Sequence, residues 1–231
     1  NKFIIMKNKI QITALLAALA MGALSINAAE NGSITGNVET KYASDHFRRG
    51  DLLSAETIQA QVGFYTSLSS IELFGDFSTS QGTGSNGANT DEARLGLGTS
   101  FLDDRLSTYL GVYNTDYSAN QDSSLEGFLE VTINTILTPT VRYYQDVDDD
   151  FETIEGQLSY NVDLDLVDLG IAGALGSADT LATKNQTYTS LTATVSKSIN
   201  DRLNVFADMS LSDTDIRDHD SAWGIGLNLQ F

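Results

Sequence analysis

The sequence has no cysteine and a single proline, Pro139. Without cysteine, disulfide bonds, thiolate metal sites and cysteine catalysis are excluded. Histidine occurs only as His46 and His219, which leaves few groups for general-base chemistry, and no pattern indicates a cofactor or a metal site. Basic residues are also scarce, with 13 lysines and arginines against 31 aspartates and glutamates. Such an acidic chain disfavours nucleic acid as a partner, because phosphate binding needs a basic surface.

The N-terminal segment has the three-part pattern of a secretory signal peptide. A short lysine-containing stretch precedes the apolar run "IQITALLAALAMGALS", and the small residues of "INAAE" close it. We expect a signal peptide over residues 1–28 with cleavage after Ala28, and residues 1–5 precede its expected start. The alternative is a membrane anchor, but the run is short for a span of about 20 residues and no basic stop-transfer cluster follows. Residues 29–231 then form one domain.

In the rest of the chain apolar and polar residues alternate, and no helical period persists. The C-terminal stretch "AWGIGLNLQF" is an example, with its large apolar residues on one face and glycine, alanine, asparagine and glutamine on the other. About twelve such segments of roughly ten residues fit tilted membrane-spanning strands. Their expected spans are 33–43, 55–66, 70–79, 91–101, 106–115, 124–133, 138–146, 152–160, 167–176, 187–196, 203–212 and 221–231.

The connections between these segments alternate between short turns and longer polar loops, as in outer-membrane barrels. The expected long loops are 44–54, 80–90, 116–123, 147–151, 177–186 and 213–220. The sequence therefore predicts an all-β protein: a closed antiparallel up-and-down transmembrane β-barrel of about 12 strands with short periplasmic turns and longer outer loops. We expect it to be integral to the outer membrane of a Gram-negative bacterium. The alternative is a soluble β-sandwich or barrel.

Aromatic residues at the ends of the apolar face favour the membrane over the soluble alternative, because barrels carry aromatic girdles at both interfaces. The expected girdle residues are Tyr42, Phe64, Phe77, Phe101, Tyr143, Tyr160, Trp223 and Phe231. The terminal Phe231 resembles the signal that barrel-insertion machinery reads in Gram-negative bacteria. The lipid bilayer, lipopolysaccharide and that machinery are the partners this predicts.

The polar face of the strands points into the barrel and is rich in carboxylates and glycine. The expected pore-lining residues are Glu39, Lys41, Glu72, Asp76, Glu92, Arg94, Glu126, Glu130, Arg142 and Glu155. A barrel of about twelve strands is intermediate in size between barrels of about eight strands, which side chains fill, and porins of 16–18 strands, which leave an aqueous channel. We expect a narrow acidic pore for passive diffusion of small hydrophilic solutes, favouring cations. The alternative is a non-conducting structural or adhesive barrel, in which the lumen carboxylates pair with the few lumen cations.

Two loop features carry weaker alternatives. Asp146 and residues 148–150 form an acidic loop that has the oxygen ligands calcium prefers but no EF-hand pattern, so a solvated loop is the preferred interpretation. His46 and His219 fall in the first and last outer loops, which a closed barrel brings together. A surface hydrolase using Asp–His pairs there is the less favoured alternative, because no second aspartate pair can be placed. We therefore expect no enzyme activity.

The stretch "SDHFRRG" over residues 44–50 concentrates scarce cationic groups and carries a family resemblance. Ser44-Asp45, Phe47 and Arg49-Gly50, followed by Gln59, Gln61 and Phe64, resemble the opening of the TorF-type family of small outer-membrane porins; His46 and the extra Arg48 depart from it. The resemblance implies an outer-membrane barrel and a channel, and it supplies no catalytic residues.

The same stretch is expected to pair with the acidic last loop and latch the barrel seam; a lid on the pore and a contact with lipopolysaccharide phosphates are its alternatives. The expected latch residues are Asp45, His46, Arg48, Arg49, Asp218 and His219.

Overall fold

The structure is a computed structural model of the chain, and it describes residues 34–49, 51–83, 89–117, 123–147, 149–179, 185–215 and 217–231. At 51, 68 and 217–219 only the backbone is described. The predicted signal peptide lies outside these ranges and stays a prediction. No helix long and apolar enough to cross a membrane occurs in the part of the chain that is described.

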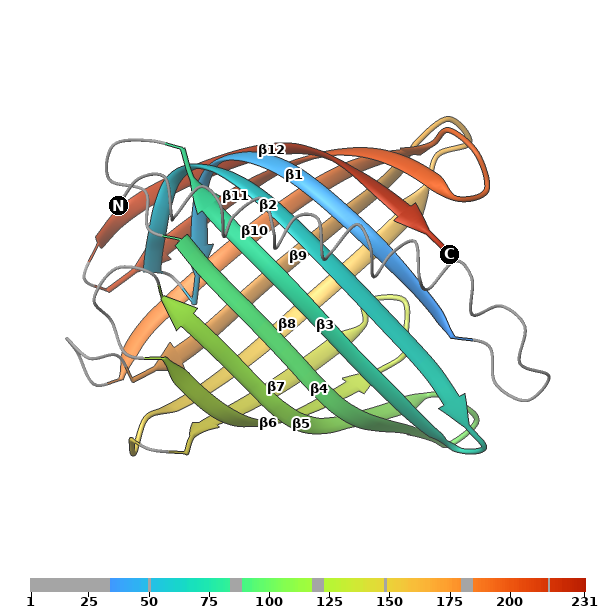
Figure 1. Cartoon of the computed structure of the whole chain (residues 1–231), viewed down its shortest axis with the longest axis horizontal. Helices are drawn as coiled ribbons and strands as arrows, with labels where there is room; N and C mark the ends of the chain where they lie inside the picture. The colour runs from blue at the N-terminus through green and yellow to red at the C-terminus, as the bar shows by residue number, and fades with distance from the viewer. Residues whose placement is uncertain are drawn as a thin grey trace, which may run out of the picture.

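Twelve antiparallel strands close into one barrel, in which every strand pairs with its neighbours in sequence and β1 pairs with β12 (Figure 1). This confirms the predicted fold class. The strands are β1 (Thr35–Arg48), β2 (Asp51–Leu68), β3 (Ile71–Gly82), β4 (Asn89–Phe101), β5 (Leu106–Tyr117), β6 (Ser124–Ile133), β7 (Pro139–Asp146), β8 (Glu152–Asp163), β9 (Asp168–Ala178), β10 (Gln186–Ser198), β11 (Leu203–Thr214) and β12 (Arg217–Gln230).

The barrel is sealed at the seam between its first and last strands. Seven residue pairs run from Asn37↔Gln230 to Ala43↔Gly224. Beyond them, the backbone amides of Gly36 and Phe231 each donate to the other's carbonyl oxygen at 3.0 Å. Along this seam, closure pairs the backbone groups of the first and last strands, which a sheet in lipid requires because no water is available at an open edge.

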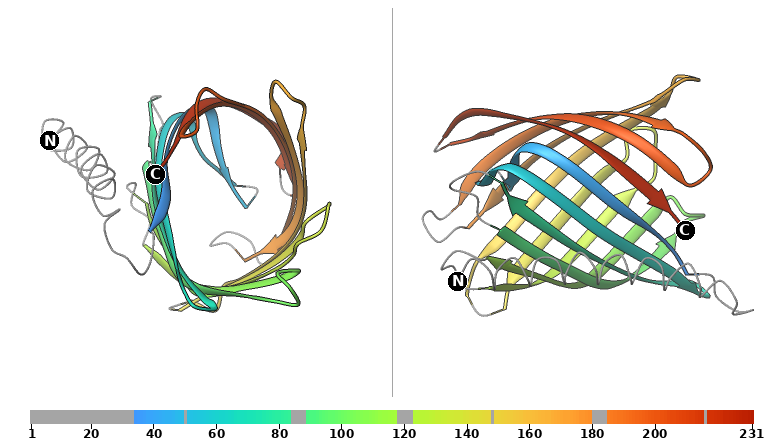
Figure 2. Two further views of the ribbon diagram at one scale, coloured as in Figure 1. Left: turned by 90° about the vertical axis from the view of Figure 1, so that its right-hand side faces the viewer. Right: turned by 45° about the horizontal axis from the view of Figure 1, so that its top comes forward.

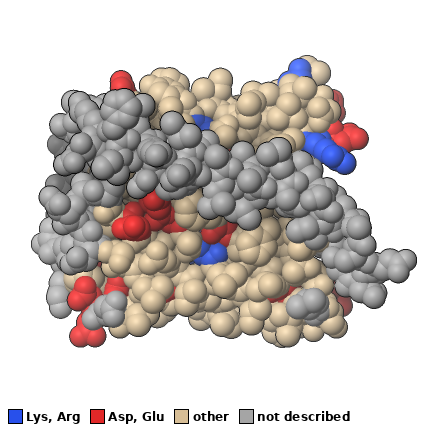
Figure 3. Space-filling model, viewed as in Figure 1, with Lys and Arg blue, Asp and Glu red and all other residues tan. Residues whose placement is uncertain are grey.

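The outer face of the barrel is apolar because the period-2 pattern sends every second side chain outward. On β12, for example, Ile225 is 54% exposed and Leu227 48% exposed, whereas their neighbours Gly224 and Gly226 face inward. In Figure 3 uncharged residues make up most of the visible barrel surface. Acidic side chains lie toward its two ends, and a group of acidic side chains with a basic one is visible near the middle of the view. Of the eight expected girdle residues, Tyr42, Phe64, Phe101, Tyr160 and Trp223 are exposed on the outer face.

The two ends of the barrel differ in their connections. One end, here called the short-turn end, has the connections 69–70, 102–105, 134–138, 164–167 and 199–202. The other, called the long-loop end, has 83–88, 118–123, 147–151 and 179–185, together with 49–50 and 215–216. The expected long loops at 44–54 and 213–220 are therefore wrong. There the strands continue past the expected ends and meet in tight hairpins.

Candidate functional site

The candidate site is the barrel lumen, which carries a network of charged and aromatic side chains. All ten predicted pore-lining residues have the inward phase. The face is identified as inner by Glu126 of β6, which contacts Arg48 of β1, a strand from the far side of the barrel. Tyr113 lies opposite Glu126 on β5, and Arg94 lies opposite Tyr113 on β4, so they share that inner face.

Ion pairs along the wall satisfy most of these lumen charges. Arg142 on β7 donates to Glu130 on β6 at 2.7 Å and to Glu155 on β8 at 2.8 Å, so it bridges three neighbouring strands. Arg94 donates to Asp76 on the adjacent β3 at 2.8 Å.

Another ion pair skips a strand, because Lys41 on β1 reaches Asp208 on β11 at 2.7 Å. Lys41 passes over Gly224 of the intervening β12, where an added Cβ would lie 2.3 Å from the lysine Cε.

Large side chains lie over several inward glycines, so these positions do not leave open space. An added Cβ on Gly96 would lie 2.7 Å from the ring of Phe74, and one on Gly98 would lie 2.4 Å from the ring of Tyr109. Phe74 and Tyr109 meet edge to face with their ring centroids 5.4 Å apart. The guanidinium of Arg94 lies 5.3 Å from the Phe74 ring centroid, so this part of the wall is both aromatic and cationic.

Part of the lumen is nevertheless open space. A cavity of about 300 Å³ lies against this aromatic wall, and one of about 470 Å³ lies at the short-turn end, between the start of β1 and the end of β12. A third cavity of about 150 Å³ lies nearer the long-loop end, and it is lined by residues of β1 to β4 that include Glu39, His46 and Glu92.

The most unexpected element of the lumen is the end of the β1–β2 hairpin. Pairing of β1 with β12 stops at Ala43, and pairing of β2 with β3 stops at Thr57. Beyond that level, the strand pairs of residues 45–48 and 51–55 join only these two segments to each other. We call residues 44–49 and 51–56 the lumen hairpin. In Figure 2 (left) the end of β1 and β2 bends away from the wall into the barrel.

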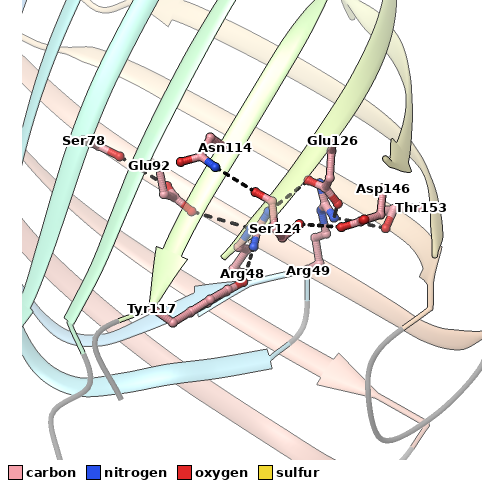
Figure 4. Close-up of polar contacts among 10 residues, drawn as sticks. All are labelled: Arg48, Arg49, Ser78, Glu92, Asn114, Tyr117, Ser124, Glu126, Asp146 and Thr153. Carbon is pink, nitrogen blue, oxygen red and sulfur yellow. Dashed lines mark hydrogen bonds and ion pairs between the residues drawn. The ribbon is translucent and has the colours of Figure 1, made fainter. Parts of the chain in front are cut away.

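The tip of the lumen hairpin presents two arginines to the facing wall (Figure 4). Arg49 donates two hydrogen bonds to the carboxylate of Glu126, at 2.6 and 2.8 Å, and one to the hydroxyl of Thr153 at 3.2 Å. Arg48 donates to Glu126 at 3.2 Å and to the hydroxyl of Tyr117.

Further contacts of Arg48 and Arg49 add to the docking of the tip. Arg48 also pairs with Glu92, with 3.6 Å between Nε and Oε1. The guanidinium of Arg49 lies 4.1 Å from the ring centroid of Tyr144. Bidentate carboxylate binding and ring stacking are the interactions that distinguish arginine from lysine.

These contacts revise the predicted latch. The ion pairs that the structure gives Arg48 and Arg49 lead across the lumen to β4 and β6, and not to Asp45. Because β1 leaves β12 after Ala43, the first hairpin turns away from the seam instead of following it. The side chains of Asp218 and His219 lie outside the described residues, so their predicted part in a latch or an Asp–His site stays a prediction.

Within the described ranges, no group of three or more histidine, aspartate or glutamate side chains is placed to hold a metal ion. Residue 148 of the acidic loop lies outside the described residues. Asp146 accepts a hydrogen bond from Ser124 at 2.8 Å and from the amide of Asp149 at 2.9 Å, so it organises its own turn.

The aromatic side chains of the lumen were not among the predicted site residues. Phe74, Tyr113, Phe128 and Tyr144 lie around the arginines, and the alternation already put them on the polar face of their strands. An aromatic residue out of phase with the lipid-facing pattern is the signal that identifies them.

Solved structures with the same architecture are outer-membrane proteins. The KdgM porin matches with a TM-score of 0.55 and 11% identity over 85% of this chain and 99% of its own. The chain has the fold of an outer-membrane porin barrel. The NanC porin matches with a TM-score of 0.53, 11% identity and coverage of 84% and 98%. An outer-membrane channel from Pseudomonas putida F1 matches with a TM-score of 0.56, 11% identity and coverage of 88% and 97%. No family model and no curated protein matches the sequence.

Proposed function

We propose that the protein is a porin-like channel that lets small hydrophilic solutes diffuse across the outer membrane. The observation that carries this proposal is the contrast between an apolar outer face and a charged lumen that still holds cavities of about 300 and 470 Å³. A barrel that served only as a membrane anchor would have no need for space lined by Arg94, Tyr109 and Glu130. The fold shared with solved porins supports the same conclusion.

The charge balance of the lumen supports a preference for cations. The paired or hydrogen-bonded carboxylates of the inner face are Glu39, Glu72, Asp76, Glu92, Glu126, Glu130, Asp146, Glu155 and Asp208. The cations that pair there are Lys41, Arg48, Arg49, Arg94 and Arg142. The excess of negative charge attracts cations to the lumen and raises their local concentration.

The membrane context belongs to the same proposal. The TorF-type family remains the proposed family on the residues quoted above, and the outer membrane of a Gram-negative bacterium the proposed location. We propose that Phe231 supports recognition by the barrel-insertion machinery as well as closing the seam with Gly36. Lipopolysaccharide would contact the exposed rim of the long-loop end.

Planar-bilayer recording tests the function. Residues 29–231, refolded into lipid, should give discrete conductance steps and a reversal potential of cationic sign in a potassium chloride gradient. Folding is checked first by the shift in gel mobility between unheated and boiled protein. A folded protein that gives no steps would refute the channel, and a clear anion preference would refute the role of the acidic lumen.

The second candidate is a non-conducting structural or adhesive barrel. The observation in its favour is the lumen hairpin, whose arginines reach the facing wall and occupy the long-loop end. The same recording separates the two candidates, because a structural barrel gives no conductance under any ionic condition. A surface hydrolase remains the weakest candidate, since it needs the Asp–His pairs at His46 and His219 to meet, and the side chain of His219 lies outside the described residues.

A further inference from the structure

The lumen hairpin spans the full width of the barrel. In a closed ring of twelve strands, β6 is five strands from β1 in one direction and β8 is five strands from it in the other. Arg49 contacts Glu126 on β6 and Thr153 on β8, so the tip of the hairpin meets the wall on both sides of the position opposite β1. The contacts cross the lumen and do not follow the wall around.

The backbone of the hairpin is shaped for this crossing. Glu56, at the point where β2 leaves the wall, has φ of 50°, in the left-handed region that most residues avoid. Its carbonyl oxygen accepts from the amide of Thr83 at 2.6 Å, which anchors the bend to the end of β3. A register shift between His46 and Phe47 adds a second bend in β1, as β-bulges do. Arg49 also has φ of 50°, and it turns the chain at the tip.

The cavity beside the hairpin is smaller than the two cavities toward the short-turn end. It measures about 150 Å³, room for about five water molecules. The cavities toward the short-turn end measure about 300 and 470 Å³. Every strand contributes a buried inward residue near the long-loop end. These residues are Ala43, Thr57, Ser80, Thr90, Thr115, Glu126, Asp146, Thr153, Ala178, Gln186, Ser212 and Ala222.

We propose that the lumen hairpin is the constriction of the channel, and that Arg48 and Arg49 set its size limit and charge preference. The proposal rests on the channel function proposed above. The two guanidinium groups offset the charges of Glu92 and Glu126 at the narrowest level, so the excess negative charge acts in the wider part of the lumen. The solutes that fit are small hydrophilic molecules and monovalent cations. Larger solutes are excluded by the hairpin itself.

Shortening the hairpin tests the size limit. His46 and Ser54 lie opposite each other in the hairpin ladder. Residues 47–53 can therefore be replaced by Asn-Gly, which forms a two-residue turn between paired strands. Because conductance follows the open cross-section, the shortened protein should conduct at least about twofold more than the unmodified protein. It should also admit larger uncharged sugars in a liposome-swelling assay.

Point substitutions at the tip test the charge preference without changing chain length. Arg48→Gln with Arg49→Gln removes two cations and undocks the tip, so conductance and cation preference should both rise. Glu126→Gln undocks the same tip but removes an anion, so conductance should rise while cation preference falls. The control pair Arg105→Gln with Lys197→Gln makes the same change in charge at exposed positions at the short-turn end, and it should leave conductance unchanged.

The outcomes separate the constriction from the channel itself. If the unmodified protein conducts and the shortened, folded variant conducts equally, the constriction is refuted and the channel stands. If neither folded protein conducts, the channel is refuted and the constriction with it. If only the shortened variant conducts, the hairpin is a plug that closes the lumen, and both the open channel and the constriction are refuted. Equal selectivity shifts in the arginine and glutamate variants would refute the role of the tip charges.

Discussion

Glu126 is the anchor of the lumen hairpin, and neutralising it should release the tip. Its carboxylate accepts two hydrogen bonds from Arg49, at 2.6 and 2.8 Å, and one from Arg48 at 3.2 Å. Removing one partner of a fully buried ion pair costs about 3–5 kcal/mol. Here the arginine side chains keep 14% and 17% exposure, and Arg48 retains Glu92 and Tyr117, so we expect about 2–3 kcal/mol for Glu126→Gln.

Trypsin measures this release directly, because it cleaves after Arg48 and Arg49, which the variant retains. If docking and undocking are fast, cleavage tracks the undocked population. A loss of 2–3 kcal/mol therefore accelerates cleavage by roughly 30- to 150-fold. The folded protein is digested in lipid nanodiscs, where both barrel ends are accessible, and cuts within residues 48–50 are followed by mass spectrometry over time.

Glu130→Gln is the matched control, since it makes the same change on the same strand. Its partner Arg142 retains Glu155 at 2.8 Å, and neither residue touches the hairpin. Cleavage after Arg48 and Arg49 should therefore remain at the native rate. If Glu126→Gln is cut no faster than Glu130→Gln, the cross-lumen ion pairs do not hold the hairpin, and the reasoning from burial and geometry fails.

Two further predictions concern the barrel wall. Gly111→Ala should lower the free energy of unfolding in urea by about 1–3 kcal/mol, because its Cβ would lie 2.1 Å from the Leu95 carbonyl oxygen. Gly127→Ala on the next strand, which has nothing within 4 Å, should be nearly neutral, and equal effects would contradict this packing. Leu129→Arg, at a 43% exposed position in the middle of β6, should cost about 2–4 kcal/mol in a lipid bilayer, and no loss there would argue against a lipid-facing surface.

The barrel itself could be predicted from the sequence because lipid imposes a strict rule on every spanning strand. Outward residues must be apolar, so the period-2 pattern persists, and the span 124–133 matches β6 residue for residue. The inward phase of Glu92, Arg94 and Glu126 follows from the same pattern. Which carboxylate pairs with which arginine does not, because pairing depends on the register between strands and on side chains that cross the lumen.

The lumen hairpin could not be predicted because the rule that outward residues are apolar applies only to the strands of the barrel wall. Beyond Ala43 and Thr57 the two strands leave the wall and pair with each other, so this pairing needs no apolar outer face. The polar stretch "SDHFRRG" therefore indicated a loop, although His46 and Asp45 form ladder pairs with Ser54 and Ala55. The bend at Glu56 depends on a positive φ at a residue with no sequence signature for it.

The position of the scarce cations has a physical reason that the hairpin makes visible. An acidic chain with 13 basic residues has little need of them for solubility, since its net charge is already far from zero.

Inside a closed barrel, however, carboxylates on facing strands repel one another across a medium of lower dielectric than water. Lys41, Arg94 and Arg142 relieve this repulsion along the wall. Arg48 and Arg49 relieve it across the lumen, because the hairpin that carries them projects from the opposite wall. A lumen hairpin without arginines would therefore lose its attraction to the facing wall and leave Glu126 unpaired, so we infer that these charges and the inward bend depend on each other.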